Sequence, residues 1–261
     1  SPPQLADKEL ARLAAATEAM RREIDGKAYV EQYVHTLTHE MKSPLSAIRG
    51  AAELLQEGNV PEPMRARFLA NIDGESLRLQ RLVDRLLSLA GVEKRQQLEQ
   101  TETVDLAAIA AIELEAKRPL AERKGLTLTL ECDADCSLAG DRFLLEQAIS
   151  NLLDNAIEFS LPDGAVALQI SGSGSTLSLR VRNDGPAVPD YALGRVFERF
   201  YSLPRPDGQR KSTGLGLSFV REIARLHRGR VSLYNRAEGG VEVEMMLNRN
   251  HQEREDAASL S

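Results

Sequence analysis

His39 and Glu40 are adjacent residues whose side chains together suit nucleophilic chemistry. An imidazole titrates near neutrality, so it can act as a nucleophile, an acid or a base. The carboxylate of Glu40 could accept the Nδ1 proton of His39, which would leave Nε2 free to attack an electrophile. His39 is therefore the candidate nucleophile, and Glu40 is the candidate base that orients it.

Two simpler interpretations of His39 compete with this one. A histidine on the exposed face of a helix usually has no chemical role. His35 and His39 also stand four residues apart, a spacing that two metal ligands on one helix face share. The other histidines, His227 and His251, lie far downstream, with no cysteine or carboxylate at ligand spacing. The pattern therefore disfavours a metal centre.

Two amphipathic helices must position His39. Apolar residues recur every three or four positions over residues 27–56, which predicts a long helix with His39 on its solvent side. Pro44 lies inside this helix, removes one backbone hydrogen bond and is expected to bend it. A turn at 58–63 and a second helix at about 63–94 follow. Because the connection is short, we expect the helices to lie antiparallel.

A single hairpin cannot bury the apolar stripes of both helices. A homodimer that forms a four-helix bundle would bury them, so we expect one. Such stripes belong to an internal core in most proteins, and that alternative stays open. Residues 4–25 carry a further amphipathic pattern, and Gly26 follows it as a joint. We expect this first helix to enter from an upstream segment.

The pattern changes after Gly91. Residues 93–102 are polar and predict a linker, after which strands and helices alternate. This order indicates an α+β sandwich, a mixed sheet under helices, and a charged, disordered tail from Asn248 onward. Helices are expected at 105–124, 141–160 and 215–227, and strands at 126–131, 166–171, 177–182, 230–235 and 241–247.

Amides and glycines in this second half could bind a nucleotide. Asn151 and Asn155 lie four residues apart on one helix face, where their oxygens could ligate a hard cation such as Mg²⁺. Asn183 ends a strand before a tight turn and could present its carbonyl to a base. Gly214 and Gly216 precede a helix, where backbone N–H groups can approach phosphates. Each signal alone is weak.

Charge and composition exclude several classes of protein. The net charge of −6 argues against an electrostatic nucleic-acid binder. The sequence shows neither an apolar run of membrane-spanning length nor a signal peptide, so we expect any membrane contact to come through segments absent from this chain. Cys132 and Cys136 are too few for a disulfide framework, and we expect them to have packing roles.

Five stretches, taken in order, resemble the H, N, G1, F and G2 boxes of the sensor histidine kinases of two-component systems. The resemblance covers about residues 27–247. It implies an all-α helical hairpin, a four-helix bundle on dimerisation, followed by an α+β two-layer sandwich ATP-binding domain of Bergerat type. The five stretches are residues 39–45, 151–160, 183–188, 197–201 and 213–217.

The same resemblance implies the order of the domains. A membrane-proximal signalling helix, the end of a HAMP-like linker, comes first, and a disordered tail comes last. The phosphotransfer domain and the catalytic domain lie between them, joined by a linker. The implied bounds are 1–26 for the signalling helix, 27–94 for the dimerisation and histidine phosphotransfer domain, 95–103 for the linker, 104–247 for the catalytic ATP-binding domain and 248–261 for the tail.

The activity implied by the resemblance is ATP-dependent phosphorylation of His39. The phosphoryl group would then pass to an aspartate in the receiver domain of a response regulator. Glu40 would orient and deprotonate His39, and Ser43 would position water for dephosphorylation of the regulator. The family also implies a homodimer and the cytoplasmic portion of a bacterial inner-membrane sensor.

The resemblance further implies how ATP and Mg²⁺ would bind. Asn151 and Asn155 would hold Mg²⁺ and phosphates, Asn183 would accept the adenine amino group, and Phe159 would stack on the base. A mobile lid would run over residues 186–213. The remaining candidates for nucleotide binding are Gly185, Phe197, Arg199, Arg205, Arg210, Lys211, Thr213, Gly214, Leu215, Gly216 and Leu217.

Three residues depart from the common pattern of this family. Asn183 replaces an aspartate, Ala187 replaces a glycine that would be strained if its φ is positive, and Glu158 replaces a lysine and would repel phosphate. These departures motivate an alternative, a catalytically weak docking module or pseudokinase that binds a response regulator without phosphate transfer. A chaperone-like or topoisomerase-like ATPase is disfavoured by the residues around His39.

Overall fold

The computed structural model describes residues 35–58, 60–99, 101–133, 135–206 and 212–249. The chain divides into two compact units, Ser1–Arg81 and Leu82–Ser261, which are described separately below. The predictions for the helix at 4–25, for Gly26, for the start of the His39 helix and for the end of the tail lie outside the described residues. None of the helices within the described ranges is long and apolar enough to cross a bilayer.

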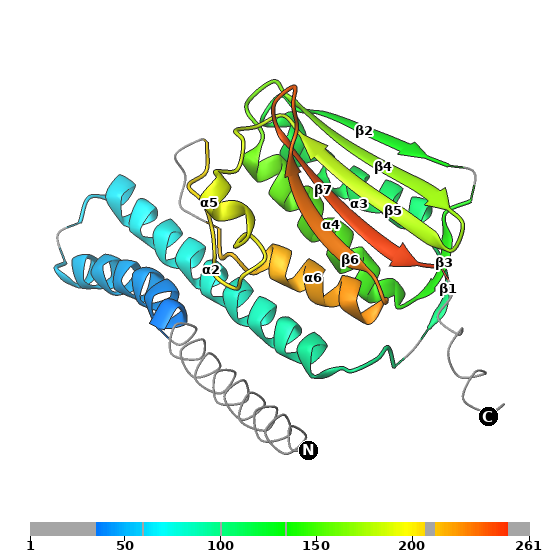
Figure 1. Ribbon diagram of the computed structural model, residues 1–261. Coiled ribbons are helices and arrows are strands. Elements are labelled where there is room, and N and C mark those ends of the chain that lie inside the picture. Colours follow the sequence, from blue (N-terminus) through cyan, green and yellow to red (C-terminus); the bar gives the residue numbers. More distant parts are fainter. Residues whose placement is uncertain (1–34, 59, 100, 134, 207–211, 250–261) are drawn as a thin grey trace, which may run out of the picture. The chain divides into compact units, whose positions relative to one another are not determined.

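The first unit is built on two helices, the blue and cyan helices of Figure 1. Residues 35–56 are helical without interruption. The second helix is α2 (Glu62–Lys94), whose last part belongs to the second unit. The end of the first helix and both ends of α2 agree closely with the sequence prediction. Gly58 has a φ of +81° in the connection, a conformation that costs glycine little. Arg78 of α2 donates a hydrogen bond to the Glu40 carboxylate over 3.4 Å, which joins the two helices.

Apolar side chains in the first unit remain partly uncovered. Ala51 and Pro44 are buried. Several larger aliphatic side chains are not, although the periodicity of the sequence marks them as packing residues. The single hairpin therefore leaves apolar surface in water, at Leu45, Leu54, Met64, Leu69 and Leu77.

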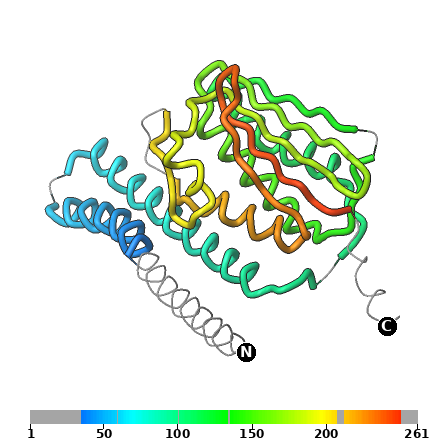
Figure 2. The backbone as a smooth tube through the Cα atoms, in the orientation of Figure 1, coloured from blue at the N-terminus to red at the C-terminus, as the bar shows by residue number. Residues whose placement is uncertain are grey.

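The second unit is a mixed five-stranded sheet with the order β2-β4-β5-β7-β6, covered on one face by helices (Figures 1 and 2). Strands β2 and β4 are parallel, and the other neighbours are antiparallel. The α+β two-layer prediction is confirmed. The strands are β2 (Thr127–Cys132), β4 (Ala165–Ser173), β5 (Thr176–Asn183), β6 (Arg230–Asn235) and β7 (Val241–Asn248), and the helices are α3 (Leu106–Glu122), α4 (Arg142–Phe159) and α6 (Gly216–Leu226).

Helix α4 is the central helix of this unit. Eight of its residues, Leu144 to Ile157, are buried on the face that meets the sheet and the other helices. Each fully buried leucine or isoleucine contributes about 1.5–3 kcal/mol. The side chain of Asp141 accepts a hydrogen bond from the Leu144 N–H over 3.1 Å and caps the first turn. The local sequence thus positions Asn151 and Asn155 on a rigid helix.

A small second sheet was not expected from the sequence. Strand β1 (Glu102–Asp105) pairs antiparallel with β3 (Ser137–Gly140), so the predicted linker at 95–103 ends in a strand. The helix expected from residue 105 begins at Leu106, because Asp105 is its N-cap. Four-residue strands show too little alternation to be recognised in a sequence. A short helix, α5 (Asp190–Leu193), also lies within the predicted lid.

Candidate active site

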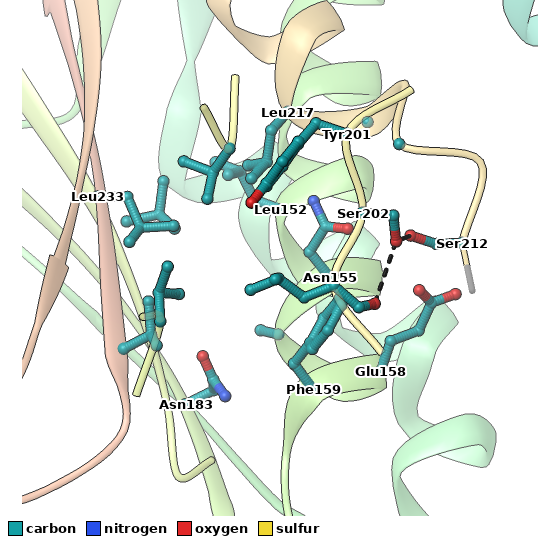
Figure 3. Close-up of a pocket in the computed structure, with 18 of the residues that line it drawn as sticks. Leu152, Asn155, Glu158, Phe159, Asn183, Tyr201, Ser202, Ser212, Leu217 and Leu233 are labelled. Atoms are coloured by element: carbon teal, nitrogen blue, oxygen red, sulfur yellow. Dashed lines mark hydrogen bonds between the residues drawn. The ribbon is translucent and has the colours of Figure 1, made fainter. Parts of the chain in front are cut away.

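A cavity of about 350 Å³ opens in the second unit between α4, the sheet and residues 186–206. Strands β5, β6 and β7 supply one part of its apolar wall, and α4 contributes three polar side chains, Asn151, Asn155 and Glu158 (Figure 3). Such a combination of apolar walls and few convergent polar groups is typical of ligand sites. The apolar wall includes Val181, Leu233, Val241 and Val243.

The amides of Asn151 and Asn155 meet the start of α6. Asn151 Nδ2 donates to the Gln147 carbonyl over 2.7 Å, which leaves its Oδ1 for other partners. Asn155 Nδ2 is buried and has no hydrogen-bond partner among the described residues. A Cβ at Gly216 would lie 3.2 Å from Asn151 Oδ1 and 3.3 Å from Asn155 Nδ2. The two amides therefore lie against the first residue of α6.

The N-terminus of α6 lacks the side-chain cap that α3 and α4 have. Its N-cap residue is Leu215, which cannot accept hydrogen bonds through its side chain. The first N–H groups of this helix therefore have no side-chain acceptor at its N-cap, and such groups attract anions. Thr213, Gly214 and Gly216 also line the cavity here.

Gly214, which follows the lid (residues 186–213), packs against the backbone of Phe200. Its φ is +65°, and a Cβ there would lie 2.5 Å from the carbonyl carbon of Phe200. The Phe200 N–H donates to the Gly214 carbonyl over 2.9 Å. The hydroxyls of Ser202 and Ser212 are 2.9 Å apart and join the two arms of the lid (Figure 3). Glycine is required at 214 because a side chain would collide with backbone.

Asn183 lies at the other end of the cavity, as the last residue of β5 and across from Phe159 (Figure 3). The next residue, Asp184, accepts hydrogen bonds from the Ala165 N–H over 3.0 Å and from Arg236 over 3.1 Å. A Cβ at Gly185 would lie 2.2 Å from the Phe159 carbonyl oxygen, so the turn can pack against the end of α4 only with glycine.

Ala187 is not strained, contrary to the conditional expectation from the sequence. The non-glycine residues with positive φ in the described part of the chain are Asp163, Phe200 and Arg228. Ala187 lines the cavity with an ordinary backbone conformation, so a glycine is not needed at this position.

Glu158 neither turns to solvent nor stands alone at the cavity wall. Its carboxylate forms an ion pair with Arg205 of the lid over 2.7 Å. Burial raises the pKa of Glu158, and the guanidinium of Arg205 opposes this only in part. Lys124 donates to the Glu158 backbone carbonyl over 3.1 Å. The anion that the sequence places near a phosphate site therefore anchors a lid cation.

The raised pKa of Glu158 predicts a pH dependence of stability. The folded protein holds this proton more tightly than the unfolded chain, so the stabilisation is complete below about pH 4.5 and is lost as the pH rises through the raised pKa. Glu158→Gln should lack this loss, and thermal melting between pH 4 and 8 measures it. Arg205→Gln removes the cation that lowers the pKa of Glu158, so the loss of stability should become larger and extend to higher pH. Identical pH profiles for Glu158→Gln and the unmutated protein would contradict the prediction.

Some predicted residues lie away from the cavity. Arg199 pairs with Glu93, whose pKa burial raises. Leu215 is 1% exposed and packs beneath the start of α6. Arg210 and Lys211 lie outside the described residues. Of the remaining described candidates, Gly185, Phe197 and Arg205 also do not line the cavity.

Sequence reasoning missed several residues that line the cavity. Tyr201 is the last residue of the stretch 197–201, and the Arg195 guanidinium lies 4.5 Å from the centre of its ring. Tyr191 belongs to the short helix α5, and Leu233 comes from β6. The aromatic side chain at the end of the stretch 197–201 was a signal that could have identified Tyr201. No signal in the sequence indicated that β6 would line the cavity, because this depends on the order of the strands in the sheet.

His39 lies in the first unit on the exposed face of its helix, as the periodicity predicts. Its ring centre is 4.5 Å from that of His35. The Glu40 carboxylate reaches Arg78 and not His39, so the expected acid–base pair is not assembled in this structure. Ser43 is exposed one turn after His39.

The comparisons with known proteins assign both units to one family. The model of the His Kinase A (phospho-acceptor) domain matches residues 29–95, and that of the histidine kinase-, DNA gyrase B- and HSP90-like ATPase matches residues 140–251. The sensor protein CreC of Escherichia coli is 49% identical over 95% of this chain. The chain belongs to the sensor histidine kinases. The similarity to CreC is the one that residues 34–52 and 197–205 predict.

Further relatives support membership of the sensor histidine kinases. The sensor protein SphS of Synechococcus elongatus is 34% identical over 78% of this chain. The crystal structure of full-length ShkA in complex with AMPPNP is 25% identical, with a TM-score of 0.61, over 83% of this chain and 45% of ShkA. The chain spans about half the length of CreC and of SphS, 51% in each case.

Proposed function

We propose that this chain is an ATP-dependent protein histidine kinase that phosphorylates its own His39 and passes the phosphoryl group to an aspartate of a response-regulator receiver domain. One observation carries the proposal. The unpartnered Nδ2 of Asn155, the Oδ1 of Asn151 and the N-terminus of α6 meet in one cavity, in a chain whose other unit matches a phospho-acceptor domain.

The residues of the cavity suit ATP and Mg²⁺. The amide oxygens of Asn151 and Asn155 are hard ligands appropriate for Mg²⁺, which neutralises phosphate charge when bound. The first N–H groups of α6 and the backbone at Gly214 would hold the phosphates. Phe159 would stack on the adenine, and Asn183 would bind its Watson–Crick edge. The related ShkA was crystallised in complex with AMPPNP, an ATP analogue, which supports nucleotide binding by this chain.

The transfer itself is an in-line displacement at the γ-phosphorus. His39 Nε2 forms the new N–P bond as the bond from phosphorus to the bridging oxygen of ADP breaks. The Nδ1 proton passes to Glu40, which must first exchange Arg78 for His39. Exposure of His39 leaves its ring accessible to a phosphate brought by the second unit. Ser43 would position water when the phosphorylated regulator is hydrolysed.

The hairpin would function as a homodimer. Leu45, Leu54, Met64, Leu69 and Leu77 are each 42–53% exposed in the single chain. A second copy of the hairpin would cover them in a four-helix bundle and thereby gain the free energy of apolar burial. The family resemblance further implies the domain bounds given above, a HAMP-like helix at 1–26 and a position on the cytoplasmic side of a bacterial inner membrane.

Incubation of the purified chain with γ-labelled ATP and Mg²⁺ tests the proposal. The protein should acquire a label that is labile in acid and stable in base, as a phosphoimidazole is. A receiver domain added afterwards should take the label from the protein. Absence of label under conditions where ATP binds would contradict the proposal.

The same experiment addresses the alternative of a docking module or pseudokinase. The neutral amide at Asn183 favours that alternative, because it binds the adenine amino group without the charge that an aspartate would supply. A docking module would bind the receiver domain without acquiring label. Binding of the receiver, measured by calorimetry beside the labelling, separates the two functions.

Replacement of Pro44 should change the balance between kinase and phosphatase activity. Pro44 is buried in a helix that continues from residue 35 to 56, and it lacks the N–H that would bond to the Glu40 carbonyl. Pro44→Ala restores that bond and straightens the turn between His39 and Ser43. We expect the ratio of the two activities to change about fivefold, a difference of about 1 kcal/mol.

The matched control is Pro61→Ala, because Pro61 lies in the connection and outside both helices. Labelling of His39 and loss of label from a phosphorylated receiver are measured for both variants. If Pro44→Ala leaves both rates unchanged, Pro44 does not act as a hinge.

A further inference from the structure

Asn183 is a buried polar side chain whose hydrogen-bonding groups are unused in the folded protein. It is 7% exposed and lines the cavity. No hydrogen bond to its side chain is found among the described residues. Its backbone is held in register by Val166 of β4 and Val241 of β7, so the side chain cannot move away from the cavity easily. A ligand group is therefore the natural partner for this amide.

The group that faces the ligand here is neutral. The neighbouring carboxylate, Asp184, is occupied by the Ala165 N–H and by Arg236, and it holds the turn. Glu158 is the acidic residue among the described residues of the cavity wall, and it is paired with Arg205. The end of the cavity that would bind the base thus presents an amide, which has both a donor and an acceptor. A carboxylate at the same place would have acceptors only.

An amide and a carboxylate differ in which purines they can bind. Oδ1 of an asparagine accepts a hydrogen bond and Nδ2 donates one, whereas both oxygens of a carboxylate only accept. The Watson–Crick edge of adenine presents a donor at N6 and an acceptor at N1. That of a 6-oxopurine presents the reverse, an acceptor at O6 and a donor at N1.

Rotation of the Asn183 amide by half a turn exchanges its donor and its acceptor. The described residues make no hydrogen bond to the Asn183 side chain that would oppose this rotation. Gly185 also leaves space beside the amide, since a Cβ there would lie 2.8 Å from Asn183 Nδ2. The same side chain can therefore match both kinds of purine edge.

We propose that Asn183 allows the cavity to bind 6-oxopurine nucleoside triphosphates nearly as well as ATP. This inference rests on the proposed function, because it takes the cavity to be the nucleotide site of the kinase. It assigns to Asn183 the role of a specificity-determining residue. Substitution by aspartate would restore discrimination, because a carboxylate facing O6 brings two acceptors together.

Calorimetric titration of the full chain with ATP and with ITP, each with Mg²⁺, tests the inference. ITP carries a 6-oxopurine without the 2-amino group of guanine, so it isolates the exchange of donor and acceptor. We expect the Kd for ITP to lie within about tenfold of that for ATP in the unmutated protein. In Asn183→Asp, the ratio of the two values should rise about tenfold or more in favour of ATP.

A second variant keeps the inference testable if Asn183→Asp folds poorly. Asn183→Ala removes the donor and the acceptor together. It should therefore weaken the binding of both nucleotides and leave the two Kd values within about tenfold of each other. Two results would overturn the inference while leaving the proposed kinase activity intact. One is a Kd for ITP well above ten times that for ATP in the unmutated protein. The other is a ratio of these two Kd values in Asn183→Asp that equals the ratio in the unmutated protein. Failure of both nucleotides to bind would overturn the proposed function and this inference with it.

Discussion

His39→Gln should remove the acid-labile label completely after incubation with γ-labelled ATP and Mg²⁺. Glutamine approximates the size and polarity of histidine but its amide nitrogen is not a nucleophile at neutral pH, so no N–P bond can form. Binding of ATP in the second unit should be unchanged, because none of the cavity residues is altered. The measurement is the label per chain beside the ATP affinity from calorimetry.

His35→Gln is the matched control for this variant. His35 is also exposed, lies one turn earlier on the same helix and has its ring centre 4.5 Å from that of His39. The His35→Gln variant should retain the label, because His39 is unchanged and His35 is not followed by a carboxylate as His39 is. Label lost in His35→Gln and kept in His39→Gln would reverse the assignment of the nucleophile.

Asn155→Ala should lower the affinity for ATP with Mg²⁺ about 100-fold and reduce labelling in parallel. The substitution removes the amide at the start of α6, where cation and phosphates would meet. A loss of this size corresponds to about 2.8 kcal/mol. Calorimetry with ATP, in the presence and in the absence of Mg²⁺, measures it.

The stability of Asn155→Ala without nucleotide separates binding from folding. Asn155 Nδ2 is buried without a partner among the described residues, so its removal should not destabilise the protein and should raise the unfolding free energy by about 1 kcal/mol. Gln147→Ala on the same helix, outside the cavity wall, is the control and should bind ATP normally. A destabilised Asn155→Ala with undiminished ATP affinity would show that the amide is structural.

The helices were largely predictable from the sequence because their signals are local. The helix expected at 141–160 is observed at Arg142–Phe159, with Asp141 as its N-cap and Ser160 as its C-cap. Capping residues and a 3.6-residue periodicity act within a few positions of the chain, so they survive in any tertiary context. The small sheet of β1 and β3 was not predictable, because its short strands lie more than thirty residues apart.

The candidate nucleotide site was predictable in its parts and not in its electrostatics. The spacing of Asn151 and Asn155 and the glycines before α6 indicated which groups would face phosphate. The sequence suggested that Glu158 would repel it. The ion pair with Arg205, 47 residues away in the chain, shows that this carboxylate holds the lid instead. Side-chain pairing over such a separation follows from the packing of α4 against the lid.

By itself, the sequence determined the order of the elements, the exposure of His39 and the residue types available to bind a nucleotide. Tertiary structure alone decided which of them face the cavity. It directs Arg199 to Glu93, leaves Asn155 Nδ2 without a hydrogen-bond partner among the described residues and turns Glu40 toward Arg78. The physical reason is that periodicity and capping are local, whereas the partner of a charged or amide side chain is chosen by contacts between segments distant in the chain.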